Sequence, residues 1–500
     1  MLLPERKENY MANTGPLSGI RVLEFTQIIA GPLSCQLLAD LGADVVKIEP
    51  LQGEPWRLAQ QFIPQESKTY QALNRGKRSL AIDLGHPDAK AIIYRLIADI
   101  DVVVINYRPD VPSRLGIDYE ELKKIKPDII YADNTAFGRE GPWADRPGYD
   151  IVVQAASGLM AQSEKIDERG HPSVGGAVAD YTTGYSIALG VCAALFFRQQ
   201  TGKGQKIETS LLINALNIQG QSMELPAADS IERSALLQDL SDREKDGIDY
   251  AQFIKNHQRV RQIYYRAYVT KDGAIAIGAL SASLREKVRS ALNIEHNRED
   301  PDYDAKDPNQ IKIDENITEL VESMIKENTS DYWEKVFEKA GVPVSSVHWV
   351  QELADHPQIQ ANKYMIDLDH DLSGPQRMAA PPWKMSASVL NPSTASPPLG
   401  RDTDDVLKNI EKHKQKFEIV ANEIWDYAEV GYQELKSANL LINTLQSEGF
   451  EIKTNLAGIP TAFIAEFNNG GPIIGILGEF DALPGLAQTQ SPFKEVINNS

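Results

Sequence analysis

The stretch LSGIRVLEFTQIIAGPLSCQLLADLGADVVKIEP (17–50) decides the fold, because strand and helix patterns alternate along it. The apolar run at 20–26 predicts a strand, and Gly31-Pro32 opens a helix that reaches Leu41. A second apolar run at 44–49 predicts the next strand. Two strands joined by a helix at this distance form a parallel βαβ unit.

The same alternation continues to about residue 220, so the sequence predicts an α/β fold with an open, doubly wound, Rossmann-like parallel sheet. Parallel sheets of this kind carry helices on both faces. We expect further strands at 79–83, 101–106, 128–135 and 205–209, with helices at 87–99, 118–125 and 184–199.

The pattern changes three times further along the chain and predicts four segments. Residues 17–225 form the N-terminal part of a large domain. Residues 226–345 form a smaller α+β domain with a hairpin near Lys271-Asp272-Gly273. Proline-rich residues 346–407 return to complete the large domain. Residues 408–500 are a separate tail, helical to about 444 and strand-like at 450–485.

The composition indicates a soluble globular protein, with 42% hydrophobic and 24% charged residues among 500. No apolar run reaches the roughly 20 residues of a membrane span. The net charge of -19 argues against nucleic acid as a partner. With only Cys35 and Cys192 there is neither a disulfide framework nor a cysteine metal site. We expect a cytoplasmic protein, and either Met1 or Met11 can be its natural start.

Asp180, in the segment GGAVADYTTGYSIALGVCAAL (175–195), is the candidate catalytic residue. Two glycines precede it and a long apolar helix follows. Burial raises the pKa of a carboxyl group whereas a helix N-terminus lowers it. The alternative interpretation is that Asp180 only caps a helix beginning near Thr182.

Residues 17–407 resemble the class III CoA-transferase (CaiB/BaiF) family, which includes formyl-CoA:oxalate, carnitine and bile-acid CoA-transferases. The resemblance rests on motifs in the family's order across nearly the whole of this range. They are the opening stretch 17–50, NRGKRSLAIDL (74–84), DVVVINYRPDVPSRLGIDYEELKKIKPDIIYA (101–132), GYD (148–150), VADYTTG (178–184), TGKGQKIETSLL (201–212) and PPLGRDTDDVL (397–407).

The resemblance implies that Asp180 is the nucleophile of an acyl-CoA transferase. Its attack on the donor thioester gives a mixed anhydride, and the released CoA thiolate then forms an aspartyl-CoA thioester. A small free carboxylic acid, the acceptor, attacks this thioester. The CoA thioester is a substrate, and no metal or permanently bound cofactor is needed. The resemblance also implies a homodimer of two interlocked rings.

The resemblance places CoA against the first strand-to-helix loop and against basic residues that can hold phosphates. Arg75 and Lys77 are equally compatible with phosphate contacts and with solvated surface charge. At the position in the first loop where the family's oxalate enzyme has Gln, this chain has Ile29. The family's glycine-rich loop, which covers the active site, has no counterpart in the sequence at 225–265. The CoA-binding candidates are Ile28, Ile29, Arg78, Asn106, Arg108 and Arg114, and Tyr149 and Asp150 are expected near Asp180.

Three other functions are alternatives to a CoA-transferase. α-Methylacyl-CoA racemases resemble the same family but use the His of a GHD motif, where this chain has Gly148-Tyr149-Asp150. A tyrosine with a pKa near 10 is a poor base for that reaction. An NAD-binding protein would need a GxGxxG motif after the first strand, which is missing. A CoA-binding protein without catalysis is the third alternative.

The tail resembles the start of an M20-type amidohydrolase, close to aminobenzoyl-glutamate hydrolases. The resemblance lies in IWDYAEVGYQELKSANLLINTLQSEGFEI (424–452) and FIAEFNNGGPIIGILGEFDALPGL (463–486), which includes Glu479 and Asp481. That family's later metal-binding motif does not follow, and His413 is the only histidine of the tail. We therefore expect a truncated fragment without hydrolase activity.

Overall fold

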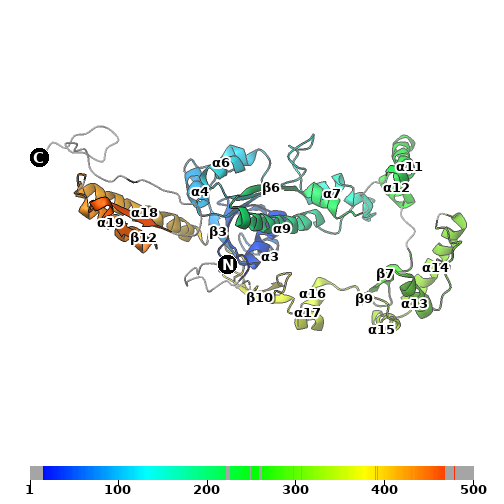
Figure 1. The fold of residues 1–500 in the computed structure, drawn as a ribbon. Coiled ribbons are helices and arrows are strands. Elements are labelled where there is room, and N and C mark those ends of the chain that lie inside the picture. Colours follow the sequence, from blue (N-terminus) through cyan, green and yellow to red (C-terminus); the bar gives the residue numbers. More distant parts are fainter. Residues whose placement is uncertain are drawn as a thin grey trace. The chain divides into compact units, whose positions relative to one another are not determined.

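The computed structural model divides the chain into two units, Met1–Gly400 and Arg401–Ser500 (Figure 1). Within the described residues, no helix has both the length and the apolar character that crossing a bilayer requires. The structure describes residues 15–220, 226–247, 249–257, 262–296, 298–305, 307–388, 390, 392, 394–431, 433–467 and 478.

A six-stranded sheet lies in the first unit, in the order β3-β2-β1-β4-β5-β6, and every neighbouring pair is parallel. Leu23 faces Val46 on one side and Val103 on the other. This order is that of a doubly wound Rossmann-type sheet, so the predicted parallel sheet is confirmed. The strands are β1 Arg21–Phe25, β2 Asp44–Glu49, β3 Lys77–Ala81, β4 Val102–Ile105, β5 Ile130–Thr135 and β6 Gln205–Ser210.

Helices connect these strands, and the core lies between them and the sheet (Figure 1). Val22, Val104 and Ala132 of the strands pack with Leu37 and Val191 of the helices α1 and α9. The central strands are buried along nearly their whole length because a parallel sheet is covered on both faces. The helices are α1 Ala30–Asp40, α2 Pro55–Leu58, α3 Lys68–Ala72, α4 Ala89–Ile97, α5 Val111–Leu115, α6 Tyr119–Ile125, α7 Asp150–Ala156, α8 Leu159–Gln162, α9 Val178–Thr201 and α10 Leu211–Asn217.

Helix α9 begins at Val178, six residues before the predicted start at residue 184. The prediction was wrong here because Thr182, Thr183 and Gly184 read as weak helix formers. In the structure the hydroxyl groups of Thr182 and Thr183 donate to the carbonyl of Ala179, so they are satisfied within the helix. Gly202, with φ of 70°, ends the helix.

Residues 262–346 contain a second apolar core, around the antiparallel sheet β7-β8-β9. The turn between β7 and β8 spans residues 270–273, which confirms the predicted hairpin. Val321, Trp333 and Phe337 pack on Ile275 of the sheet. The elements from 226 to 346 are α11 Pro226–Asp246, α12 Tyr250–His257, β7 Tyr265–Val269, β8 Ala274–Gly278, α13 Ala282–Leu292, α14 Pro308–Lys326, α15 Ser330–Ala340 and β9 Val344–Ser346.

The segment after β9 makes hydrogen bonds with the first part of the chain. The carbonyl of Pro397 accepts from Arg57 at 2.9 Å, and the amide of Gly400 donates to Ser79 at 2.9 Å. Arg75 donates to the carbonyl of Ala379 at 2.7 Å. The elements of this segment are α16 Val350–Leu353, α17 Pro357–Asn362, β10 Met365–His370 and β11 Gly374–Ala379.

In the second unit, the helix predicted from residue 408 begins at Thr403 and ends near Ala428, which has φ of 47°. Its continuation to 444 is a separate helix, so one predicted pattern becomes two helices. Of the strand pattern at 450–485, the described part forms one antiparallel hairpin. The elements are α18 Thr403–Tyr427, α19 Leu435–Ser447, β12 Glu451–Thr454, the 3-10 turn Leu456–Gly458 and β13 Phe463–Glu466. Glu479 and Asp481 lie outside the described residues.

Candidate active site

Asp180 lies in the first turn of α9 and is 7% exposed. The residue at the N-cap is Ala177, and no side chain caps this helix. The interpretation of Asp180 as the cap of a helix beginning near Thr182 is therefore wrong. Its carboxylate is free for another role.

Two backbone amides connect Asp180 to its surroundings. The amide of Ala30, at the start of α1, donates to the Asp180 carboxylate. The amide of Asp180 itself donates to Oδ1 of Asp150 at 3.0 Å. Gln154 donates to the other oxygen of Asp150 and, at 2.8 Å, to the carbonyl of Gly176. Asp150 thus fixes the backbone of Asp180, and Ala30 faces its side chain.

Burial raises the pKa of Asp180 from 3.8 to about 7. The negative charge of Asp150 adds to this increase, and the amide of Ala30 opposes it. A carboxylate with a pKa near 7 is more basic than an ordinary aspartate yet ionised in part at neutral pH. Such a group is suited to nucleophilic attack and to leaving again as a carboxylate.

Gly184, which sequence reasoning did not single out, allows the contact between Asp180 and α1. A Cβ atom at this position would lie 2.8 Å from Cδ2 of Leu33 and 3.0 Å from the carbonyl oxygen of Ala30. Gly184 is one helical turn beyond Asp180, so close approach here brings Asp180 to the amide of Ala30. The available signal was a glycine inside a long helix, where it costs about 1 kcal/mol relative to Ala.

The loop between β1 and α1 lies where the strand order reverses, between β1 and β4. In open α/β sheets, ligands bind at this position, beyond the carboxyl ends of the strands. Ile28 and Ile29 lie in the loop, and Asn106 follows β4. The side chain of Asn106 accepts from the amide of Gln27 at 3.0 Å and donates to its carbonyl at 2.9 Å. Asn106 therefore braces the loop through its backbone.

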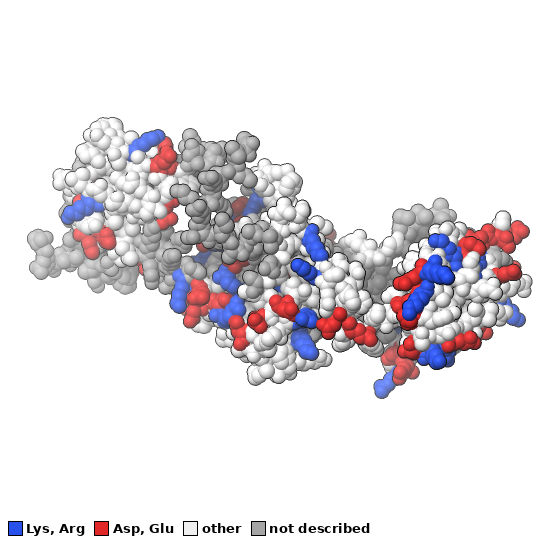
Figure 2. Space-filling model, turned by 90° about the horizontal axis from the view of Figure 1, so that it is seen from below, with Lys and Arg blue, Asp and Glu red and all other residues white. Residues whose placement is uncertain are grey.

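The basic candidates divide into surface and interior groups. Arg108 and Arg114 are exposed and lie within 3.6 and 3.4 Å of the Asp110 carboxylate. Arg78 is partly exposed and lies 2.6 Å from Asp44. These three side chains carry charge at the surface. Acidic and basic groups are interspersed on the face of the molecule shown in Figure 2.

Arg75 and Lys77 belong to the interior. Arg75 lies 2.6 Å from Asp40, and Lys77 lies 2.8 Å from Glu24, with all four side chains buried. Neither interpretation from the sequence, phosphate contact or solvated surface charge, describes them. Their charges are balanced by carboxylates inside the protein.

Tyr149 immediately precedes α7 and is 61% exposed. Among the described residues no hydrogen bond joins it to Asp180. The structure thus brings Asp150 of this pair to Asp180, and leaves the tyrosine ring toward solvent.

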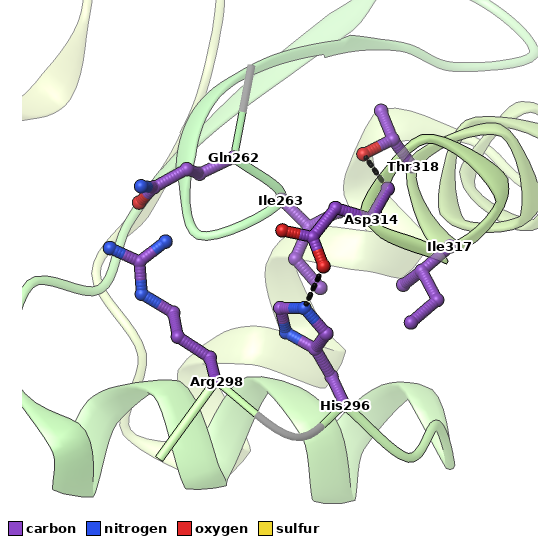
Figure 3. A pocket seen from close by; sticks show the side chains of 7 residues that line it. All are labelled: Gln262, Ile263, His296, Arg298, Asp314, Ile317 and Thr318. Carbon is purple, nitrogen blue, oxygen red and sulfur yellow. Dashed lines mark hydrogen bonds and ion pairs between the residues drawn. The ribbon is translucent and has the colours of Figure 1, made fainter. Parts of the chain in front are cut away.

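A small pocket lies beside α14 (Figure 3). Nε2 of His296 is 3.0 Å from Asp314, and Nδ1 is 2.8 Å from the hydroxyl of Tyr264. Burial would raise the pKa of Asp314, but Tyr303, His296 and Gln310 hold it below its usual value. Because both ring nitrogens and the carboxylate are satisfied by neighbours, we interpret this cluster as structural.

A family model and several known proteins match most of the chain. The family model described as CoA-transferase family III covers residues 17–403. Succinyl-CoA:glutarate CoA-transferase of Homo sapiens is 29% identical over 416 residues, 82% of this chain and 90% of that protein. Succinate--glutarate CoA-transferase of Agrobacterium fabrum is 31% identical over 407 residues, with shares of 79% and 96%. A crystal structure of a CAIB/BAIF family protein from Brucella suis has a TM-score of 0.62 and 27% identity, with shares of 80% and 100%.

The match to the family model extends from Leu17, four residues before β1, to Thr403, the first residue of α18. It includes the six-stranded sheet, the loop at its switch point, Asp180 and the segment that returns to Arg57 and Ser79. The chain therefore belongs to CoA-transferase family III and is a CoA-transferase.

Proposed function

We propose that the protein moves CoA from an acyl-CoA to a small free carboxylic acid, with Asp180 as the nucleophile. The observation that carries this proposal is a buried carboxylate with a pKa of about 7 that receives the amide of Ala30. A nucleophile needs both an ionised fraction and donors that stabilise charge developing on oxygen.

Each step of the proposed reaction exchanges one acyl bond for another. An oxygen of Asp180 attacks the thioester carbonyl, the C–S bond breaks, and CoA leaves as a thiolate. The thiolate then attacks the Asp180 carbonyl of the anhydride and releases the donor acid. The acceptor carboxylate attacks the resulting aspartyl-CoA thioester, the C–S bond breaks, and CoA leaves again as a thiolate. This thiolate attacks the acceptor's carbonyl of the new anhydride, which yields the product acyl-CoA and free Asp180.

The CoA moiety is proposed to bind at the switch point of the sheet, beside Ile28, Ile29 and Asn106. Arg78, Arg108 and Arg114 then supply positive charge for its phosphates, since each is at least partly exposed. Their aspartate partners hold them only loosely, because exposed ion pairs contribute about 0–1 kcal/mol.

The names of the similar proteins suggest which acids to test first. Relatives from Homo sapiens and Agrobacterium fabrum are named for succinate and glutarate, both dicarboxylic acids. We propose a small carboxylic acid as acceptor and place dicarboxylates first among the candidates, with carnitine-like, bile-acid and aromatic acids after them.

Mass spectrometry after incubation with a panel of acyl-CoAs tests the proposed mechanism. Hydroxylamine in the mixture converts an activated carboxylate to a hydroxamate. We expect the hydroxamate on Asp180, together with release of free CoA. Deuterium uptake next to the thioester without label on Asp180 would instead support a racemase, and neither signal with any donor would support CoA binding without catalysis.

The rate of transfer is expected to rise with pH through a midpoint near 7. The reason is that only the ionised form of Asp180 attacks, and burial keeps it protonated below this pH. Initial rates of kcat/KM between pH 5 and 9 measure this midpoint. A midpoint near 4, the ordinary value for aspartate, would contradict the assignment of Asp180 as a desolvated nucleophile.

We propose a homodimer, supported by an apolar stripe on α9. Its exposed members Val178, Tyr181, Tyr185 and Leu189 recur at helical spacing, on one face of the helix. Apolar side chains gathered in this way favour an interface with another protein surface. Sedimentation at micromolar concentration is expected to give twice the mass of the 55.4 kDa chain, and a monomer would contradict the proposal.

The inactivity of the tail as a hydrolase and the cellular location of the protein stay predictions. Two helices and a hairpin form the described part of the second unit, and we propose that it has no amidohydrolase activity. Metal-dependent amide hydrolysis that a chelator abolishes would contradict this. A cytoplasmic location is likewise proposed from the sequence.

A further inference from the structure

The loop that carries Ile28 has a strained backbone. Ile28 has φ of 72°, in the left-handed region, which a β-branched residue rarely occupies. Such a conformation costs about 1–3 kcal/mol and persists only where surrounding contacts enforce it. Contacts that enforce it should therefore be present in the structure.

Glu54 makes that contact from outside the loop. Its Oε2 accepts a hydrogen bond from the amide of Ile28 at 2.8 Å, and its Oε1 lies 3.0 Å from Nζ of Lys47. The side chains of Glu54 and Lys47 are buried. A carboxylate held by a buried ammonium group is a strong and well-placed acceptor for a backbone amide.

The same ion-pair network holds the start of the loop and the first turn of α1. Lys47 donates to the carbonyl of Thr26 at 2.8 Å, and Lys77 donates to the carbonyl of Pro32 at 2.9 Å. Glu24 lies between the two lysines, 2.8 Å from each. Burial would raise the pKa of Glu24, but the two lysines hold it below its usual value. Each charge in the network therefore has an opposite charge beside it.

The loop leads directly to the site, since Ala30 follows Ile28 by two residues and its amide faces Asp180. A change of φ at Ile28 would turn the following peptide groups and move this amide away from the carboxylate. We propose that Glu54 is a positioning residue, which holds Ile28 in its strained conformation and thereby sets the amide of Ala30 against Asp180. This inference rests on the proposed role of Asp180 as nucleophile.

A merely structural role for Glu54 predicts a different behaviour. Loss of a buried ion pair lowers stability wherever the pair lies. Only a positioning role connects the effect of Glu54 with the strain at Ile28. Glycine adopts positive φ without strain, so Ile28→Gly should let the loop keep its shape when Glu54 is absent.

The experiment is a double-mutant cycle of Glu54→Ala and Ile28→Gly, read as the rate of hydroxamate formation on Asp180. Glu54→Ala is expected to slow labelling on the order of 100-fold, the effect of a small misplacement of reacting groups. Adding Ile28→Gly is expected to recover labelling by about 10-fold through the coupling of the two sites. The pH midpoint should rise in Glu54→Ala, because the amide that lowers the pKa of Asp180 is lost.

Asp40→Asn is the matched control. Asp40 forms a buried ion pair with Arg75 at the other end of α1, away from the loop. Asp40→Asn should lower the midpoint temperature of unfolding, while the rate of labelling on Asp180 stays within about twofold of the wild type, as expected for a distant site. Where Glu54→Ala does not fold, Glu54→Gln with and without Ile28→Gly takes its place in the cycle, since it keeps an acceptor for the Ile28 amide but weakens its pairing with Lys47.

Wild-type rates in Glu54→Ala, or no recovery with Ile28→Gly, would overturn the inference. A wild-type protein that never labels Asp180 would instead overturn the proposed function. Hydrogen exchange of backbone amides tests the contact between Glu54 and Ile28 without any activity. We expect faster exchange at residues 28–30 in Glu54→Ala, and a reversal of this change when Ile28→Gly is added. Unchanged exchange would contradict it.

Discussion

Replacing Asp180 by alanine is expected to reduce acyl transfer on the order of 10⁴-fold or more, the loss that follows removal of a covalent nucleophile. Asp180→Asn should be as inactive, because an amide cannot attack a thioester or leave as a carboxylate. Steady-state transfer from an acyl-CoA to a dicarboxylic acid measures both variants. Activity within tenfold of the wild type in either one would exclude Asp180 as the nucleophile.

The asparagine variant should also be more stable at alkaline pH. The pKa of Asp180 is about 7 in the folded protein and about 4 when the chain is unfolded. Between these values the native state binds the extra proton, so the stability that Asp180 contributes falls as pH rises from 4 to 7. Well above pH 7 the buried charge destabilises the protein by about 4 kcal/mol.

Urea unfolding at pH 8 and at pH 4 measures this effect. Asp180→Asn removes the charge and should raise the free energy of unfolding at pH 8, with the gain disappearing near pH 4. Equal stability of the two proteins at both values would show that the carboxylate is not desolvated in solution. A gain in stability with a loss of activity is the behaviour expected of a functional residue.

Arg57→Met is expected to destabilise the protein by about 3–5 kcal/mol, because it leaves buried carboxylates without their partner. Arg57 is 0% exposed, and its guanidinium donates to Glu49 at 2.7 and 2.8 Å and to Glu66 at 3.1 Å. It also donates to the hydroxyl of Tyr70 and to the carbonyl of Pro397. One side chain thus holds β2, the segment before α3 and the returning chain together.

Denaturant unfolding of Arg57→Met tests this, with Arg377→Met as the control. Arg377 lies within 2.8 Å of Asp367 and 3.2 Å of Asp355, but these groups are exposed, so its loss should cost less than about 1 kcal/mol. A loss of less than about 1 kcal/mol in Arg57→Met as well would contradict this prediction. It would mean that the carboxylates of Glu49 and Glu66 find other partners or take up protons.

Periodicity in the sequence was sufficient for the sheet and for the helices α1, α4, α6 and α9, although α9 begins earlier than predicted. Strand β4 and the helix α6 lie within the predicted ranges, and the hairpin near residue 272 is present. These features depend on residues that are neighbours along the chain, and burial on one or both faces determines their pattern. The resemblance to a family then singled out Asp180, which the local pattern alone left open between nucleophile and helix cap.

The sequence by itself therefore determined the α/β class, the strands of the large sheet in chain order and the residue to test first. Only the tertiary structure decided how Asp180 meets the amide of Ala30, and that Gly184 allows this approach. It also decided that Lys77 faces Glu24 in the interior and that Glu54 accepts a hydrogen bond from the amide of Ile28. The physical reason is that a charge pattern reports which side chains are polar, whereas partners distant along the chain meet only when strands and helices pack.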